Sequence, residues 1–358
     1  LANGYLYGRG EADGSKDSAI RAQGDFDIDL NGPDYINYLD YTSVGFFDFS
    51  TDLHGGSESV NGWSQSFALS DSADPKIELN TCGTSTNNGL ADLYGTASAA
   101  NAVAIGNGTT ANGVSAVAVG HQASAAQDAA VSIGDEAVAA NQKSLAIGAN
   151  ATATNTSAIA LGNFSNAAGL EAIAIGEKSQ ASGSEAIAIG DEAVSGGSNT
   201  TSLGSAAEAQ GDSGVAIGNH STASLANGVA VGFIANAGNT SAIAIGAASN
   251  AQGAAGVAIG LNAVASQEVS TALGASAEAL GSESTALGAD TQASGDFATS
   301  VGFLATATNT SATALGRSAT AQGDSGVAIG NHSTASLANG VAVGFIANAG
   351  NTSAIAIG

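Results

Sequence analysis

One 14-residue unit recurs through the C-terminal part of the chain, and this repeat constrains the fold more than any other feature. A glycine closes every unit, from Gly106 through Gly120 and Gly134 to Gly358, at intervals of 14 residues without insertion or deletion. Strict self-similarity at a fixed short period is typical of solenoids, in which each coil packs only against its neighbours. Positions in the unit are numbered from the closing glycine, position 0, to position 13.

Two runs of alternating residues fill each unit. Positions 3 and 5 are almost always Ala, Ser or Thr, positions 10 and 12 are also small, and positions 11 and 13 are mostly Ile, Val or Leu. Alternation with a period of two predicts two short strands per unit and argues against a helix. Gly or Asn follows each run and suits a backbone that turns through left-handed conformations. The pattern therefore predicts an all-β solenoid of stacked 14-residue coils.

The alternation also assigns faces to the two strands. In the first strand, Ser179 and Ala181 are small, whereas Gln180 beside them is polar, so one face belongs to a core and the other to water. The second strand is apolar on both faces. Its small residues can meet those of the first strand, while Ile187 and Ile189 point outward. We therefore expect a thin roll with a core of small side chains and an outward row of aliphatic ones.

The outward aliphatic side chains need a cover that one copy of the chain does not supply. Each one left in water forfeits about 1.5–3 kcal/mol, and together they would form an apolar stripe larger than soluble monomers expose. Another copy has the same period, and a closed ring of three rolls would bury every stripe. The period requires a partner but does not by itself require three. The predicted interface residues are Val103, Ile105, Val117, Val119, Ile159, Leu161, Ile173, Ile175, Ile187, Ile189, Ile243, Ile245, Val257, Ile259, Val327 and Ile329.

The repeat also resembles a known family. The segment Asn101-Ala102-Val103-Ala104-Ile105-Gly106 is followed by Thr109, Ala111 and Gly113, and Glu171-Ala172-Ile173-Ala174-Ile175-Gly176 is followed by Ser179, Ala181 and Gly183. Both segments are similar to the YadA-type head repeat of trimeric autotransporter adhesins. The resemblance extends from about residue 102 to residue 358. It implies a left-handed parallel β-roll, an obligate homotrimer with the bulky strand inside, and a bacterial outer-surface protein whose head binds host matrix or other surfaces.

Composition narrows the class of protein further. The chain has 358 residues and a formal net charge of −24, which argues against nucleic acid and anionic lipid surfaces as partners. It contains no apolar run long enough to span a membrane and no signal-peptide pattern. Residues 209–246 recur identically as 321–358. We therefore expect the natural protein to continue past Gly358, with a stalk and a membrane anchor.

Residues 1–95 differ from the repeats and are expected to form a separate unit. They hold Trp63, all six Tyr and half of the ten Phe. Alternating aromatic-rich runs at 25–30 and 44–49 predict strands. A solenoid needs an atypical end unit to cover its first coil, so we expect a β-rich cap or tip domain at 1–95 and the β-roll at 96–358.

A weak calcium candidate lies in the N-terminal part. Asp25, Asp27 and Asp29 fall on one face of a predicted strand, and clustered carboxylates could bind calcium. The simpler interpretation is a solvated acidic edge strand that resists aggregation.

Two further groups of residues follow closing glycines. The first group is three histidines: His121, His220 and His332. In a trimer, the three copies of each histidine could meet at the axis as metal ligands, although an exposed turn is the simpler interpretation. Three phenylalanines at position 1 are either exposed contacts for a ligand or packing between copies: Phe233, Phe303 and Phe345.

The sequence predicts no enzyme and, apart from the calcium candidate, no cofactor. It contains no recognisable spacing of nucleophile, base and orienting acid, no phosphate-binding loop before a helix and no Cys/His cluster. We expect an extracellular adhesin head on the cell surface, held at the outer membrane by an anchor outside this stretch. It would be a stiff rod attached through many weak contacts to host matrix proteins, cells or abiotic surfaces. The alternative is a structural subunit of an extracellular filament or phage fibre that uses the roll as a spacer.

Overall fold

The computed structural model describes residues 5–7, 21–23, 65–66, 80–81 and 95–358. The chain forms two compact units, Leu1–Asn150 and Ala151–Gly358. In the first unit, β1 (Tyr5–Tyr7) pairs antiparallel with β2 (Arg21–Gln23), and β3 (Gln65–Ser66) pairs antiparallel with β4 (Asn80–Thr81). The strands predicted at 25–30 and 44–49 lie outside the described residues, and the proposed cap domain therefore stays a prediction.

The coils of the first unit alternate a short strand with a long one. The short strands pair in parallel in the order β5 (Gly95–Ala97), β7 (Thr109–Ala111), β9 (Ser124–Ala125) and β11 (Val138–Ala139). The long strands do the same in the order β6 (Val103–Ile105), β8 (Val117–Val119), β10 (Val131–Ile133) and β12 (Leu145–Ile147). Each coil thus contributes one strand to each of two parallel sheets.

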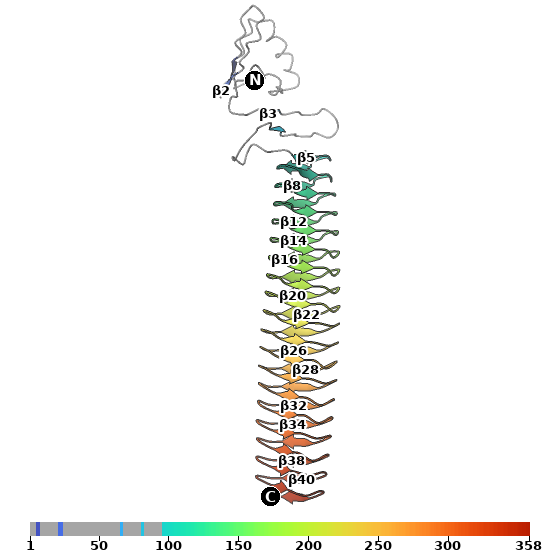
Figure 1. The fold of residues 1–358 in the computed structure, drawn as a ribbon, viewed down its shortest axis with the longest axis vertical. Coiled ribbons are helices and arrows are strands. Elements are labelled where there is room, and N and C mark those ends of the chain that lie inside the picture. Colours follow the sequence, from blue (N-terminus) through green and yellow to red (C-terminus); the bar gives the residue numbers. More distant parts are fainter. Residues whose placement is uncertain (1–4, 8–20, 24–64, 67–79, 82–94) are drawn as a thin grey trace, which may run out of the picture. The chain divides into compact units, whose positions relative to one another are not determined.

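The second unit repeats this coil in a straight stack (Figure 1). Its short strands take the odd numbers from β13 (Thr152–Ala153) to β41 (Asn348–Ala349), and its long strands take the even numbers from β14 (Ile159–Leu161) to β42 (Ile355–Ile357). In both series, each strand begins 14 residues after the one before it. Residues 95–358 are therefore a parallel β-solenoid of about 19 coils, as the period predicted.

Equivalent residues of neighbouring coils lie in register, so side chains at the same position of the unit stack on one another. Between β16 (Ile173–Ile175) and β18 (Ile187–Ile189), Ile173 pairs with Ile187 and Ala174 with Ala188. The inward alanines at positions 5, 10 and 12 are fully buried wherever they occur between residues 151 and 342. The core between the two sheets thus consists of small side chains, and the predicted thin roll is confirmed.

Small hydroxyl side chains in the core are satisfied by the turns beside them. The Ser179 hydroxyl donates to the carbonyl of Gly176 over 3.0 Å, and the Thr200 hydroxyl donates to the carbonyl of Gly197 over 2.7 Å. Ser and Thr often bond to nearby backbone in this way. The substitution of Ser or Thr for Ala at positions 3 and 10 therefore leaves no unpaired polar group at these places.

Each coil turns twice, and both turns hold a residue in the left-handed region. Lys178 at position 2 has φ 53° and Glu185 at position 9 has φ 56°. With the backbone hydrogen bonds from Ser179 to Gly176 and from Ala186 to Gly183, both are type II turns. We call positions 1 and 2 the first turn, and positions 8 and 9 the second turn.

The expectation that Gly or Asn after each run supplies the left-handed residue is only partly right. The closing glycine does have positive φ, 132° at Gly176, but Gly183 at position 7 is not among the residues with positive φ. Non-glycine residues at positions 2 and 9 take the left-handed conformation instead. The N–H of Lys178 donates to the carbonyl of Asn163, one coil earlier, over 2.8 Å. Stacking therefore fixes the turn whatever residue occupies it.

Candidate interaction surfaces

The outward side chains of the long strands form two parallel rows, at positions 11 and 13, which we call the apolar ladder. Because the strands are in register, each isoleucine stacks on its equivalents in the coils before and after, as Ile173 does on Ile187. This stacking leaves most of them half-buried, with Val103 43% and Leu161 40% exposed. None of the predicted interface residues is fully buried within one chain. The ladder therefore remains available to a partner.

The ladder is longer than the set of residues predicted from the sequence. Eleven pairs lie outside that set: five have Thr at position 11 with Leu or Val at position 13, and six are aliphatic at both positions. The pairs with Thr are Thr201 and Leu203, Thr271 and Leu273, Thr285 and Leu287, Thr299 and Val301, and Thr313 and Leu315. The aliphatic pairs are Val131 and Ile133, Leu145 and Ile147, Val215 and Ile217, Val229 and Val231, Val341 and Val343, and Ile355 and Ile357. Position within the 14-residue unit, rather than residue type, was the signal that identifies them.

The outward face of the short strands is mostly polar, with Val138, Val194 and Val264 as exceptions, and some of its side chains bond from coil to coil. The Asn236 side chain donates to the Oδ1 atom of Asn250 over 3.3 Å, and the Gln292 side chain donates to the carboxylate of Glu278 over 3.0 Å. Most of this face is therefore compatible with solvent. The two faces of the roll therefore differ in character, and the face with the apolar ladder is the one suited to burial.

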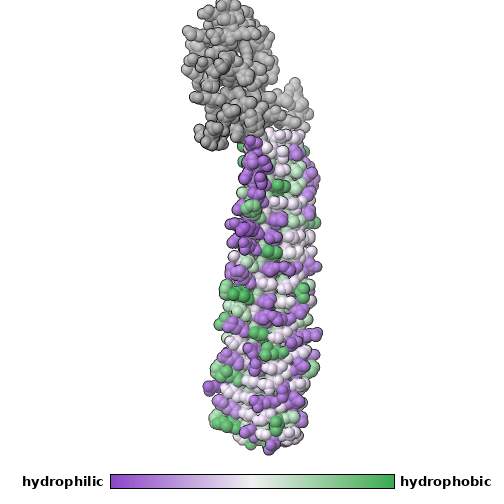
Figure 2. All heavy atoms as spheres, viewed as in Figure 1, coloured by the Kyte–Doolittle hydropathy of each residue, from purple (hydrophilic) through white to green (hydrophobic). Residues whose placement is uncertain are grey.

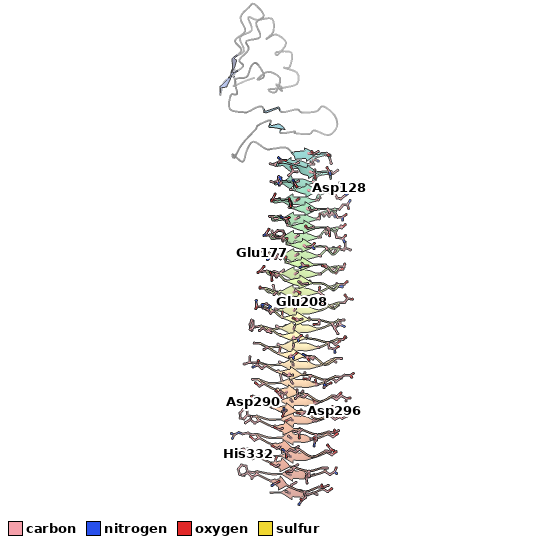
Figure 3. All side chains as sticks on the ribbon, viewed as in Figure 1. Asp128, Glu177, Glu208, Asp290, Asp296 and His332 are labelled. Atoms are coloured by element: carbon pink, nitrogen blue, oxygen red, sulfur yellow. The ribbon has the colours of Figure 1, made fainter. Side chains whose placement is uncertain are left out.

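The predicted phenylalanines all lie exposed in the first turn. The exposed fractions are 55% for Phe233, 45% for Phe303 and 67% for Phe345. In the second unit, Figure 3 places Glu177, Asp290 and His332, which are first-turn residues, along one edge of the stack and Asp296, a second-turn residue, along the other. The two turns thus form two separate edges between the two faces.

The histidines lie on the same turns and are exposed. His121 Nδ1 lies 2.8 Å from Asp135 Oδ1 of the next coil, and His220 and His332 are exposed at position 2. Within the described part of the chain, no group of three or more His, Cys, Asp or Glu residues could hold a metal ion. The calcium candidate lies outside the described residues: Asp25, Asp27 and Asp29. Among the described residues, no helix is long and apolar enough to cross a membrane.

The fold is that of a repeat protein of the parallel β-solenoid class, and comparison with known families identifies the repeat. The model of the YadA head domain repeat (2 copies) matches residues 111–137, 139–165, 167–193, 195–221, 209–235, 237–263, 251–277, 279–305 and 307–333. A search of curated proteins found no match.

The chain therefore belongs to the YadA head family. These repeats form the heads of trimeric autotransporter adhesins, which are non-enzymatic and exposed on the outer membrane. The resemblance seen in the sequence is confirmed.

Proposed function

We propose that this chain is a surface-attachment rod, a homotrimer of left-handed β-rolls in which three copies bury their apolar ladders against one another. The observation that supports this most directly is the ladder itself. Its aliphatic side chains face outward at position 13 of every described coil and are only half covered by one another. Heads of this family are trimeric, and a closed ring of three leaves no ladder exposed. The predicted interface residues, from Val103 to Ile329, would lie in this contact.

The remaining faces would attach the rod to host matrix proteins, to cells or to abiotic surfaces. The same polar strand and turns recur on each coil, so one rod presents many weak contacts whose combined avidity exceeds the affinity of any one of them. The net charge of −24 per chain keeps separate rods apart through repulsion.

Sedimentation equilibrium of the purified chain tests the assembly. We expect a mass three times the 34.1 kDa of one chain, and a folded single chain would contradict the proposal. Attachment is tested by binding of fluorescent protein to immobilised matrix proteins and to plain polystyrene beads. A trimer that binds none of them would favour a spacer role in a filament or fibre instead.

A further inference from the structure

Three first turns of the second unit each carry two exposed apolar side chains. We call them the apolar edge: Phe233 and Ile234, Phe303 and Leu304, and Phe345 and Ile346. Each of these side chains is between 45% and 67% exposed. Figure 2 shows green apolar patches at intervals down the edge of the stack on which the first-turn residues Glu177, Asp290 and His332 project in Figure 3.

Two isoleucines of the apolar edge have an unfavourable backbone conformation and also expose an apolar side chain to water. Ile234 has φ 55° and Ile346 has φ 59°, a region in which a β-branched residue is a genuine outlier. Other coils place Asn262 or Ser276 at the same position with the same φ sign. Neither turn stability nor solubility accounts for isoleucine there. Strained residues of this kind concentrate at functional sites.

Stacking keeps the strained turns rigid. The N–H of Ile234 donates to the carbonyl of Asn219 over 3.0 Å, and the N–H of Ile346 donates to that of Asn331 over 2.9 Å. The apolar side chains are therefore fixed on an ordered backbone and lose little conformational freedom when something covers them, which favours binding.

The charge along this edge sets it apart from the rest of an acidic chain. Across first turns from residue 205 to residue 346, the only Asp, Glu, Lys or Arg residues are Asp290 and Arg317. Earlier first turns of the same unit carry Glu177, Lys178, Asp191 and Glu192. Covering the apolar edge therefore removes few charges from water, which matches an uncharged partner.

We infer that the apolar edge is the part of the rod that adsorbs to uncharged, hydrocarbon-like surfaces. This inference deepens the proposed attachment function by naming a class of surface and the residues that meet it. The three turns follow one another after five and three coils, or about 24 and 14 Å at the usual strand spacing. Such a row fits an extended flat surface better than a compact ligand. A second rod of this acidic protein would be repelled, whereas an uncharged surface is not.

The test compares two variants with three substitutions each. The edge variant carries Phe233→Asn, Phe303→Asn and Phe345→Asn, because Asn occupies position 1 naturally at Asn163 and Asn219. The control variant removes three apolar residues of similar exposure from the opposite side of the coil, by Leu225→Asn, Phe297→Asn and Leu337→Asn. Adsorption to methyl-terminated and to hydroxyl-terminated alkanethiol layers is measured with a quartz crystal microbalance.

We expect the native chain to prefer the methyl-terminated layer, and the edge variant to lose affinity for it by at least about tenfold, a change of about 1.4 kcal/mol. The control variant should adsorb like the native chain. Equal loss in both variants, no loss in either, or no preference of the native chain for methyl groups overturns the inference.

Sedimentation of the same samples separates this inference from the proposed trimer. If the edge variant alone has a lower mass than the native chain, the phenylalanines pack between copies and the inference is wrong. If the native protein sediments with the mass of one chain, the proposal of a trimer is wrong. The adsorption result still decides the role of the apolar edge in that case. Species larger than a trimer in the native chain, absent from the edge variant, would show that the edge binds other rods instead.

Discussion

The carboxylate of Asp212 accepts a hydrogen bond from the backbone N–H of Ser198, one coil earlier, over 2.9 Å. Ser198 begins a second turn, and its N–H points along the stack toward the next coil. Asp296 makes the same contact to Ser282 over 2.9 Å. At these two places, an aspartate at position 8 links its second turn by a hydrogen bond to the second turn of the preceding coil.

Removing this contact should loosen the turn it holds. We expect Asp212→Ala to lower the local free energy of opening by about 0.5–1.5 kcal/mol, toward the lower end because the contact is exposed to solvent. Hydrogen exchange at the Ser198 amide measures this directly and should become faster.

Asp324 supplies the matched control, since it is the equivalent residue in the duplicated block. Its carboxylate makes no hydrogen bond to the preceding coil among those found in the described residues, where Thr310 replaces Ser198. Asp324→Ala should leave exchange at Thr310 unchanged. Equal acceleration at both amides would show that the aspartates act through charge rather than through the hydrogen bond.

The closing glycines should be the least replaceable residues of the coil. Gly176 has φ 132°, and a Cβ added there would lie 2.3 Å from the carbonyl oxygen of Gly190. Gly176→Ala therefore combines backbone strain with a clash against backbone, and we expect a loss of more than about 2 kcal/mol in stability. Thermal unfolding followed by circular dichroism measures it.

Gly196→Ala is the control for this substitution. A Cβ at Gly196 would meet nothing closer than 3.7 Å, and alanine occupies the same position at Ala126 and Ala168. Its unfolding midpoint should match or exceed that of the native chain. If both variants lose the same stability, the loss comes from replacing any glycine and not from the close approach of the coils at Gly176.

The alternation of residues within the 14-residue unit was enough to predict which side chains are buried. Ser179 and Ala181 face the core and Gln180 faces solvent, because strand side chains alternate between faces. The outward direction of Ile187 followed from the same rule. These predictions depend only on local geometry, which repeats with the sequence.

The turns could not be predicted to the same level. Residue preference places left-handed backbone at Gly or Asn, yet Glu185 and Phe164 adopt it here. Hydrogen bonds from the neighbouring coil decide their conformation, and these depend on tertiary stacking rather than on the residue itself. The contact of Asp212 is a similar case, because Asp324 has the same following sequence and does not make it.

One buried hydroxyl has no partner, and removing it should stabilise the protein. Ser300 lies in β34 (Thr299–Val301) at position 12, is fully buried, and its Oγ makes no hydrogen bond. The residues at the same position in the neighbouring coils are Ala286 and Ala314. Since an unsatisfied buried polar group costs about 1–3 kcal/mol, Ser300→Ala should raise the unfolding midpoint.

The matched comparison is Ser202→Ala in β20 (Thr201–Leu203), at the same position. The Ser202 hydroxyl donates to the carbonyl of Val194 over 2.6 Å and lies 2.9 Å from the Ser195 hydroxyl. Its removal should lower the midpoint, opposite in sign to Ser300→Ala. A shift of the same sign in both variants would mean that volume, not hydrogen bonding, sets the response.

Charge placed on the apolar ladder should break the proposed trimer. Ile173 and Ile187 are adjacent in register and half-buried, and in the proposed trimer three copies of each would face one axis. The double variant Ile173→Glu, Ile187→Glu would bury carboxylates there without partners, which is strongly destabilising. We expect dissociation to begin at a protein concentration at least about tenfold higher than for the native chain, as measured by sedimentation equilibrium.

The opposite sheet offers a control with the same pair of charges in the same parallel register. Asn166 in β15 (Asn166–Ala167) pairs with Gln180 in β17 (Gln180–Ala181), and both point outward from the polar face. The double variant Asn166→Glu, Gln180→Glu repeats the repulsion between adjacent strands without touching the ladder. It should keep the native mass at every concentration, because only the ladder would be buried between copies. If both double variants dissociate alike, repulsion within one roll explains the effect; if neither does, the ladder does not hold the copies together.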